Sequence, residues 1–162
     1  MPLTRRLLAP LLLSLGLFAS AGAASAAGNG LVTVPSRYSV QQTTARYEAA
    51  VKTKAKAGWA VFGTIDHAAA ARKAGLALRP RTLILFGNPK LGTPGMAKAP
   101  TLAIDLPMKA LVWQDDAGKV WLTYNAANYM GTVINARHGL PNPPATPKLA
   151  ALLKVFADHA TQ

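Results

Sequence analysis

Short apolar runs separated by turn-forming residues predict a β-sheet with a few helices. Three of these runs are rich in β-branched and aromatic residues and have the length of strands, namely residues 31–34, 59–65 and 82–86. Two more runs, 108–114 and 119–124, flank the sequence Asp-Asp-Ala-Gly, which predicts a hairpin. The run 82–86 is the most apolar of the five and is therefore expected to be a central strand.

Between these strands, apolar residues recur at helical spacing and predict helices. Ser39 and Gln42 have the spacing of a capping box, which predicts a helix over 40–57 that ends at Gly58. The same reasoning predicts three more helices: a short one over 68–71 capped by Asp66, one over 125–138, and a final one capped by Thr146 with Pro147 in its first turn. Together the elements predict an α+β fold, an antiparallel sheet with helices packed on one face.

The segment 87–100 is dense in glycine and proline and predicts a long connection. Two interpretations stay open: a functional loop, or a plain crossover with one helical turn near Met96. The spacing of Gly87 and Gly92 matches a phosphate-binding loop, but Thr93 stands where such a loop needs lysine. A P-loop is therefore excluded.

Residues 1–27 have the layout of a cleaved secretory signal peptide. Arg5 and Arg6 precede an apolar stretch, residues 7–18, and small residues follow. The arginine pair also resembles a twin-arginine signal, but the leucine-rich apolar stretch favours the ordinary export route. We therefore expect a periplasmic or secreted protein with no membrane span after cleavage, in which residues 28–162 form a single α+β domain.

Composition and charge narrow the function classes. The chain has no cysteine, which excludes disulfide scaffolds, iron–sulfur clusters and thiol catalysis. Its 51% hydrophobic and 15% charged residues exclude a disordered polyelectrolyte. The net charge is +12, but the basic residues are scattered and not interleaved with aromatics, so we expect no nucleic-acid partner. We expect no cofactor and no metal site.

A polar cluster is expected at one end of the predicted hairpin. A two- or four-residue loop would pair Lys109 with Tyr124 across the strands, next to Asn125, whereas a three-residue loop would break this pairing. An ammonium, a phenol and a carboxamide together suit a small anionic or carbonyl-bearing ligand. The alternative is a lysine that lies over the tyrosine at the sheet edge.

Other candidate residues lie where strands end. His67 follows a predicted strand and opens a helix, where an imidazole can donate, accept or titrate; a plain helix-start residue is the alternative. Asp66 and Asp105 are the carboxylates left for acid–base work, although each has a structural alternative as a cap or a turn residue. A metal site would require His67, His138 and a carboxylate to meet. Asn88 and Met96 complete the candidate set.

Four motifs occur in order: Phe62 with Ile65-Asp66-His67; Phe86-Gly87-Asn88-Pro89-Lys90 with Gly92, Thr93 and Met96; Asp105-Leu106-Pro107 with Lys109; and Val120, Leu122 and Tyr124-Asn125. This set resembles the domain-of-unknown-function 302 family over roughly 59–138. The resemblance implies a compact α+β fold of β-α-β4-α type that is often dimeric, and it leaves the function open. Family members tend to continue Tyr-Asn with Asp-Pro, whereas this chain has Ala126-Ala127. A role for that aspartate is therefore in doubt here.

Three functions are consistent with these patterns. The first is a module that binds a small ligand or a partner protein through His67, Asn88, Lys109, Tyr124 and Asn125, with Asp66, Met96 and Asp105 as secondary candidates. The second is an enzyme in which His67 or Asp66 acts as general base and Lys109 stabilises an anion. The third is a cationic protein that associates with anionic lipid or glycan.

Overall fold

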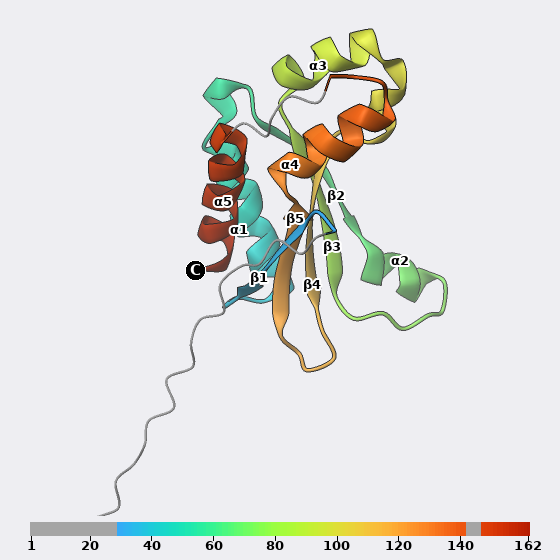
Figure 1. Ribbon diagram of the computed structural model, residues 1–162. Coiled ribbons are helices and arrows are strands. Elements are labelled where there is room, and N and C mark those ends of the chain that lie inside the picture. Colours follow the sequence, from blue (N-terminus) through green and yellow to red (C-terminus); the bar gives the residue numbers. More distant parts are fainter. Residues whose placement is uncertain (1–28, 142–146) are drawn as a thin grey trace, which may run out of the picture.

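The computed structural model describes residues 29–141 and 147–162, and its centre is one antiparallel five-stranded sheet (Figure 1). The sheet order is β1-β5-β4-β3-β2, so β3 is interior, as its apolar sequence predicts, while β1 and β2 form the edges. The strands are β1 (Leu31–Ser36), β2 (Ala60–Asp66), β3 (Arg81–Gly87), β4 (Met108–Gln114) and β5 (Val120–Asn125). The predicted signal peptide and Thr146 lie outside the described residues.

Two helices cover one face of this sheet. They are α1 (Val40–Lys52) and α5 (Pro147–Thr161), which lie side by side in Figure 1. The capping box of Ser39 and Gln42 starts α1 as predicted, and a short 3₁₀ helix, η1 (Ala55–Ala57), continues the chain to Gly58. The α+β fold with helices on one face is therefore confirmed.

Four aromatic rings form the centre of the core between sheet and helices. Tyr47 lies edge-on to Phe86 and Phe156, with centroid distances of 5.3 and 6.0 Å. Trp59 stacks on Phe86 at 6.3 Å and meets Phe156 edge-on at 5.7 Å. Edge-on and offset contacts of this kind stabilise aromatic clusters beyond the area they bury.

The remaining helices lie near the ends of the strands. They are α2 (His67–Lys73), α3 (Pro89–Lys98), the 3₁₀ helix η2 (Pro100–Ile104), α4 (Ala127–Tyr129) and the π-helical turn η3 (Met130–Asn135). Asp66 caps α2, as predicted, by accepting a hydrogen bond of 2.9 Å from the backbone N–H of Ala69. No helix within the described ranges is both long and apolar enough to cross a membrane.

Segment 87–100 is more regular than the sequence predicts. Its main element is the ten-residue helix α3, which contains Pro94. Asn88 caps this helix through its side-chain oxygen, and Pro89 occupies its first turn, where the missing N–H costs nothing. The prediction of a long connection without regular structure was wrong, and so was the alternative of one helical turn near Met96, because the cap and the following proline start a helix despite the glycines.

The β4–β5 hairpin corrects the predicted pairing of Lys109 with Tyr124. Ala110 lies opposite Tyr124, and the N–H of Asp115 donates to the carbonyl of Lys119 at 2.9 Å. The loop therefore has three residues, 116–118, and ends at Gly118 with φ +82°, a conformation that favours glycine. A shift by one residue moves side chains to the other face of a sheet. Tyr124 thus joins the buried core, while Lys109 lies on the opposite face.

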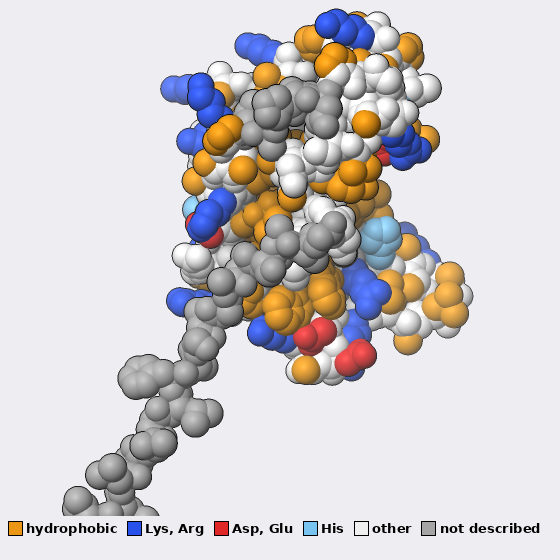
Figure 2. All heavy atoms as spheres, in the orientation of Figure 1, with side chains coloured by type: hydrophobic (Ala, Val, Ile, Leu, Met, Phe, Trp, Pro, Cys, Tyr) orange, Lys and Arg blue, Asp and Glu red, His pale blue; other side chains and the backbone are white. Residues whose placement is uncertain are grey.

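The face away from α1 and α5 remains accessible, and we call it the open face. Along β3, β4 and β5, residues of the core alternate with half-buried residues, which shows that helices cover only one side. Residues of the open face line up across the strands: Arg81, Trp113, Trp121 and Pro35 in one row, and Ile65, Leu83, Leu111, Thr123 and Thr33 in the next. Figure 2 shows hydrophobic side chains gathered over the lower part of the sheet beside charged ones.

Candidate functional site

An apolar pocket of about 670 Å³ is lined in part by residues of α3, a helix that Figure 1 shows above the upper end of the sheet. Its volume falls within the range of small-molecule sites. The lining includes Trp59, Leu85 and Met108 from the sheet region, and it continues with residues of α3, of η2 and the turn after it, of η3 and the residues after it, and of α5. The other lining residues are Phe62, Gly87, Asn88, Pro89, Leu91, Gly92, Gly95, Met96, Leu102, Leu106, Pro107, Met130, Asn135, Leu140 and Leu149.

Two glycines allow α3 to approach the η2 segment closely. A Cβ atom at Gly95 would lie 2.8 Å from Leu102 Cδ2, and one at Gly92 would lie 3.2 Å from Leu106 Cδ1. Both leucines line the pocket. The glycines therefore leave room for leucine side chains on the wall of the pocket, where larger residues would push them inward.

Two carboxamides are the polar side chains of the lining. Asn88 is engaged in structure, because its Nδ2 donates to the carbonyl of Ala57 at 2.9 Å while its Oδ1 caps α3. Asn135 is less firmly held, since its Nδ2 reaches the carbonyl of Pro141 only at 3.4 Å, longer than an ordinary hydrogen bond. Asn135 is thus the better-placed polar group for orienting a bound molecule.

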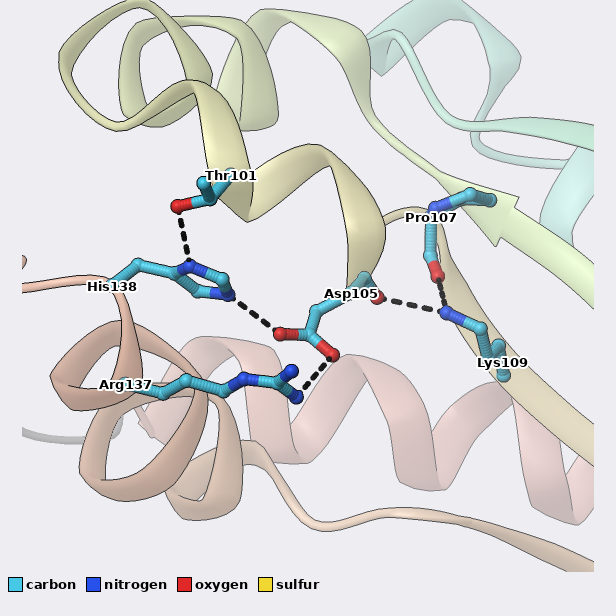
Figure 3. Close-up of polar contacts among 6 residues, drawn as sticks. All are labelled: Thr101, Asp105, Pro107, Lys109, Arg137 and His138. Carbon is cyan, nitrogen blue, oxygen red and sulfur yellow. Dashed lines mark hydrogen bonds and ion pairs between the residues drawn. The ribbon is translucent and has the colours of Figure 1, made fainter.

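A chain of hydrogen bonds joins two of the segments that line the pocket (Figure 3). His138 Nε2 lies 2.6 Å from Asp105 Oδ2, and His138 Nδ1 lies 2.8 Å from Thr101 Oγ1. Arg137 contacts the other carboxylate oxygen of Asp105 at 3.3 Å. The side chain of His138 is only 4% exposed and that of Asp105 only 17%. We call Thr101, Asp105 and His138 the Thr–His–Asp chain.

Lys109 binds two backbone carbonyls next to this group. Its Nζ donates to the backbone carbonyls of Asp105 and Pro107 at 2.8 and 2.9 Å, as Figure 3 shows. The ammonium therefore holds the turn that leads from η2 into β4. The sequence predicts a polar group of Lys109 with Tyr124 and Asn125, whereas in the structure the partners of Lys109 are two local backbone carbonyls.

The predicted site residues do not come together as one group. Asn88 and Met96 line the pocket, and Asp105 lies in the Thr–His–Asp chain. His67 is exposed at the first position of α2, next to its cap Asp66, and takes no part in that chain. The meeting of His67, His138 and a carboxylate that a metal site would require is not observed.

The other two candidates lie on β5. Tyr124 is 8% exposed in the core, and burial raises its pKa. Asn125 ends the strand opposite Leu31. A neighbouring carboxylate shows the opposite pKa effect, since the indole N–H of Trp121 donates to Asp115 at 2.8 Å and lowers the pKa of that carboxyl.

Sequence reasoning missed Thr101, Asn135 and Arg137. Thr101 and Asn135 stand in segments with no recognisable motif, and Arg137 looked like one of many scattered basic residues. His138 and Asp105 were each noted, but 33 positions separate them. Nothing in the local sequence indicates that they pair, because the contact depends on how η2 and η3 pack.

Comparison with known proteins gives one family match and several relatives. The model of the family "Domain of unknown function DUF302" matches residues 32–157. A crystal structure of an uncharacterized conserved DUF302 protein from Bacillus stearothermophilus superposes with a TM-score of 0.63 and 17% identity, covering 81% of this chain and 98% of that one. This likeness concerns the fold.

Two relatives are named as fluoride-specific ion channels FluC 1. The protein from Brucella suis biovar 1 (strain 1330) is 50% identical over 102 residues, which are 63% of this chain and 39% of that protein. The protein from Brucella abortus biovar 1 (strain 9-941) is also 50% identical over 102 residues and is covered to 37%. The chain thus spans less than two fifths of these relatives. Because the family model covers most of the chain, the protein belongs to the DUF302 family.

Proposed function

We propose that this protein is a binding module for a small, largely apolar molecule that carries one polar group. The observation that carries the proposal is the pocket of about 670 Å³, whose lining is apolar apart from Asn88 and Asn135. Apolar walls supply the affinity of such sites, and a few polar groups fix the orientation of the ligand. The anionic ligand expected from the sequence gains less support, since Lys109 is already bonded to two carbonyls.

The proposal also includes the cellular location of the protein. The sequence of residues 1–27 supports export, and we propose that the module binds its ligand in the periplasm or outside the cell. The channel function named for the longer Brucella proteins does not enter the proposal, because the match covers less than two fifths of their length. Association with anionic surfaces through the scattered basic residues stays a prediction.

The proposal is tested by dye binding to the wild type and to a variant with a larger side chain at the pocket wall. The neutral dye N-phenyl-1-naphthylamine should fluoresce on binding to the wild-type protein, and Gly95→Leu should weaken this binding at least about tenfold, or by more than about 1.4 kcal/mol. The reason is that a side chain at this position meets Leu102 at once. Fluorescence titration gives both dissociation constants.

The matched control for this test is Ala97→Leu. Ala97 is an exposed position of the same helix and does not line the pocket, so the substitution adds the same side chain outside the site. Equal affinity of Gly95→Leu and wild type, or no dye binding by the wild type, would refute the proposed function.

A second copy of this chain is the partner that we propose for the open face. Three polar side chains there hydrogen-bond one another: Thr33 and Thr123 share a hydrogen bond of 3.0 Å, and the indole N–H of Trp113 donates to Thr123 at 3.0 Å. These three side chains lose little on leaving water. Five strands at their usual spacing give the open face a flat area of roughly 500 Å². The side chains make the accessible surface larger than this flat area, which brings it close to the lower limit of buried area for stable interfaces.

Light scattering after size exclusion tests the homodimer. The wild type is expected at twice its monomer mass, and Leu111→Glu should convert it to a monomer by placing a charge at the centre of the face. Val155→Glu is the control, because Val155 is 53% exposed on α5, away from the open face. A monomeric wild type, or a dimeric Leu111→Glu with native circular dichroism, would contradict the proposal.

A further inference from the structure

We infer that the Thr–His–Asp chain hydrolyses esters whose acyl chain occupies the apolar pocket. In this inference Thr101 is the nucleophile, His138 the general base and Asp105 the positioning residue. The inference deepens the proposed function and rests on it, since the pocket must first hold the apolar part of the substrate. It differs from the sequence-based enzyme hypothesis, which assigned the base to His67 or Asp66.

The hydrogen bonds have the order that an activated hydroxyl requires. A nucleophile must reach a base, and the base must be oriented by a third group. Here the 2.8 Å contact joins Thr101 Oγ1 to His138 Nδ1, and the 2.6 Å contact joins His138 Nε2 to Asp105 Oδ2. Because a carboxylate can only accept, Nε2 carries the proton, which leaves Nδ1 of the neutral imidazole free to take the proton of the hydroxyl.

The three residues of the Thr–His–Asp chain differ in solvent exposure, as a nucleophile with a shielded base requires. The imidazole of His138 is 4% exposed and the carboxylate of Asp105 is 17% exposed, so both are held in place and shielded. Arg137 also contacts the carboxylate, and Lys109 holds the backbone of the same turn through the carbonyls of Asp105 and Pro107. Thr101, in contrast, is exposed, so a substrate can approach its hydroxyl.

The members of the Thr–His–Asp chain adjoin lining residues of the pocket in the sequence. Thr101 precedes the lining residue Leu102, Asp105 precedes Leu106, and His138 is two residues from Leu140. Each member of the chain thus belongs to a segment whose next residues form the pocket wall. For the reaction to occur, an acyl chain that lies among these leucines must place its carbonyl carbon at Thr101, the neighbour of Leu102 in η2.

The reaction balances without a cofactor. Thr101 Oγ1 attacks the ester carbonyl carbon while its proton passes to His138 Nδ1, and a C–O bond forms. The bond from the acyl carbon to the alcohol oxygen then breaks, and His138 returns the proton to the leaving alcohol. Water repeats the sequence on the acyl-threonine, giving the carboxylic acid and free Thr101.

Hydrolysis of p-nitrophenyl octanoate by the full chain tests the inference. We expect turnover by the wild type, a fall in kcat of at least about 100-fold in Thr101→Val and His138→Gln, and retained turnover in Thr101→Ser. Asp105→Asn should lower kcat with little change in KM, as expected for a positioning residue. Thr132→Val and His159→Gln change exposed residues that do not belong to the Thr–His–Asp chain, and both variants should have the kcat of the wild type.

A second readout does not depend on turnover. A fluorophosphonate should add its mass to the peptide that contains Thr101 in the wild type, and not in Thr101→Val or His138→Gln with native circular dichroism. Wild-type turnover in Thr101→Val, labelling elsewhere, or neither turnover nor labelling would overturn the inference. If the wild type shows neither turnover nor labelling but binds the naphthylamine dye, the proposed binding function stands and the esterase inference is refuted. If the wild type also fails to bind the dye, both are refuted.

Discussion

Replacing Phe156 with alanine is expected to lower the free energy of unfolding by about 3–5 kcal/mol, the range measured for buried Phe→Ala substitutions. Phe156 is fully buried and contacts the rings of Tyr47, Trp59 and Phe86 at centroid distances of 6.0, 5.7 and 6.3 Å. These three residues come from α1, from the position just before β2, and from β3, so the substitution removes the ring contacts between α5 and all three. Urea unfolding followed by circular dichroism measures the change.

Val155→Ala is the control for this substitution. The two residues are adjacent on α5, but Val155 is 53% exposed, so its truncation should change the free energy of unfolding by no more than about 0.5 kcal/mol. Similar losses for both variants would mean that α5 contributes through its helical structure alone and not through the aromatic cluster.

Replacing Tyr47 with phenylalanine is expected to raise the free energy of unfolding by about 1–3 kcal/mol, the cost of a buried polar group without a partner. Tyr47 is fully buried, and its hydroxyl has no hydrogen-bond partner within the described residues. The ring contacts with Phe86 and Phe156 remain in the variant, because only the hydroxyl is removed.

The same substitution should reduce the sensitivity of the fold to alkali. Burial raises the pKa of Tyr47 well above its usual value. The unfolded chain therefore loses the phenolic proton first, near pH 10, while the folded protein keeps it, so stability falls as the pH rises above about 10. Tyr47→Phe should show a smaller fall, and not its absence, because the pKa of Tyr124 is also raised.

Thermal unfolding between pH 8 and pH 11 measures this effect. Tyr38→Phe is the control, since the hydroxyl of Tyr38 donates to the carbonyl of Gln162 at 2.8 Å and its loss removes a satisfied contact. Tyr38→Phe should be neutral or slightly destabilising, with the alkaline slope of the wild type. An unchanged slope in Tyr47→Phe would show that its hydroxyl does not control alkaline unfolding.

Elements whose start depends on neighbouring residues could be predicted from the sequence. The capping box of Ser39 and Gln42 and the cap at Asp66 use contacts three residues apart, so both helix starts were predicted correctly. The strands followed from their apolar runs in the same way. The α+β fold and the DUF302 resemblance were therefore accessible without coordinates.

The site depends on contacts between distant segments, and here prediction was limited. The register of Lys109 and Tyr124 turned on whether the hairpin loop has two, three or four residues, which the sequence Asp-Asp-Ala-Gly did not decide. The pairing of Asp105 with His138 depends on the packing of two irregular segments. Asn88 and Met96 were identified through their motif, but the wall of the pocket that they line depends on the close approach of α3 to Leu102 and Leu106, which Gly95 and Gly92 allow.

The two edges of the sheet determine how copies of this chain can meet. At one edge, Pro35 in β1 lacks the N–H that a further strand would require. At the other, the register of β2 shifts between Val61 and Gly63, which interrupts the regular row of backbone donors and acceptors. Neither edge is a good template for growth by strand addition. Concentrated solutions of this protein should therefore resist fibril formation, despite the tryptophan-lined surface between these edges.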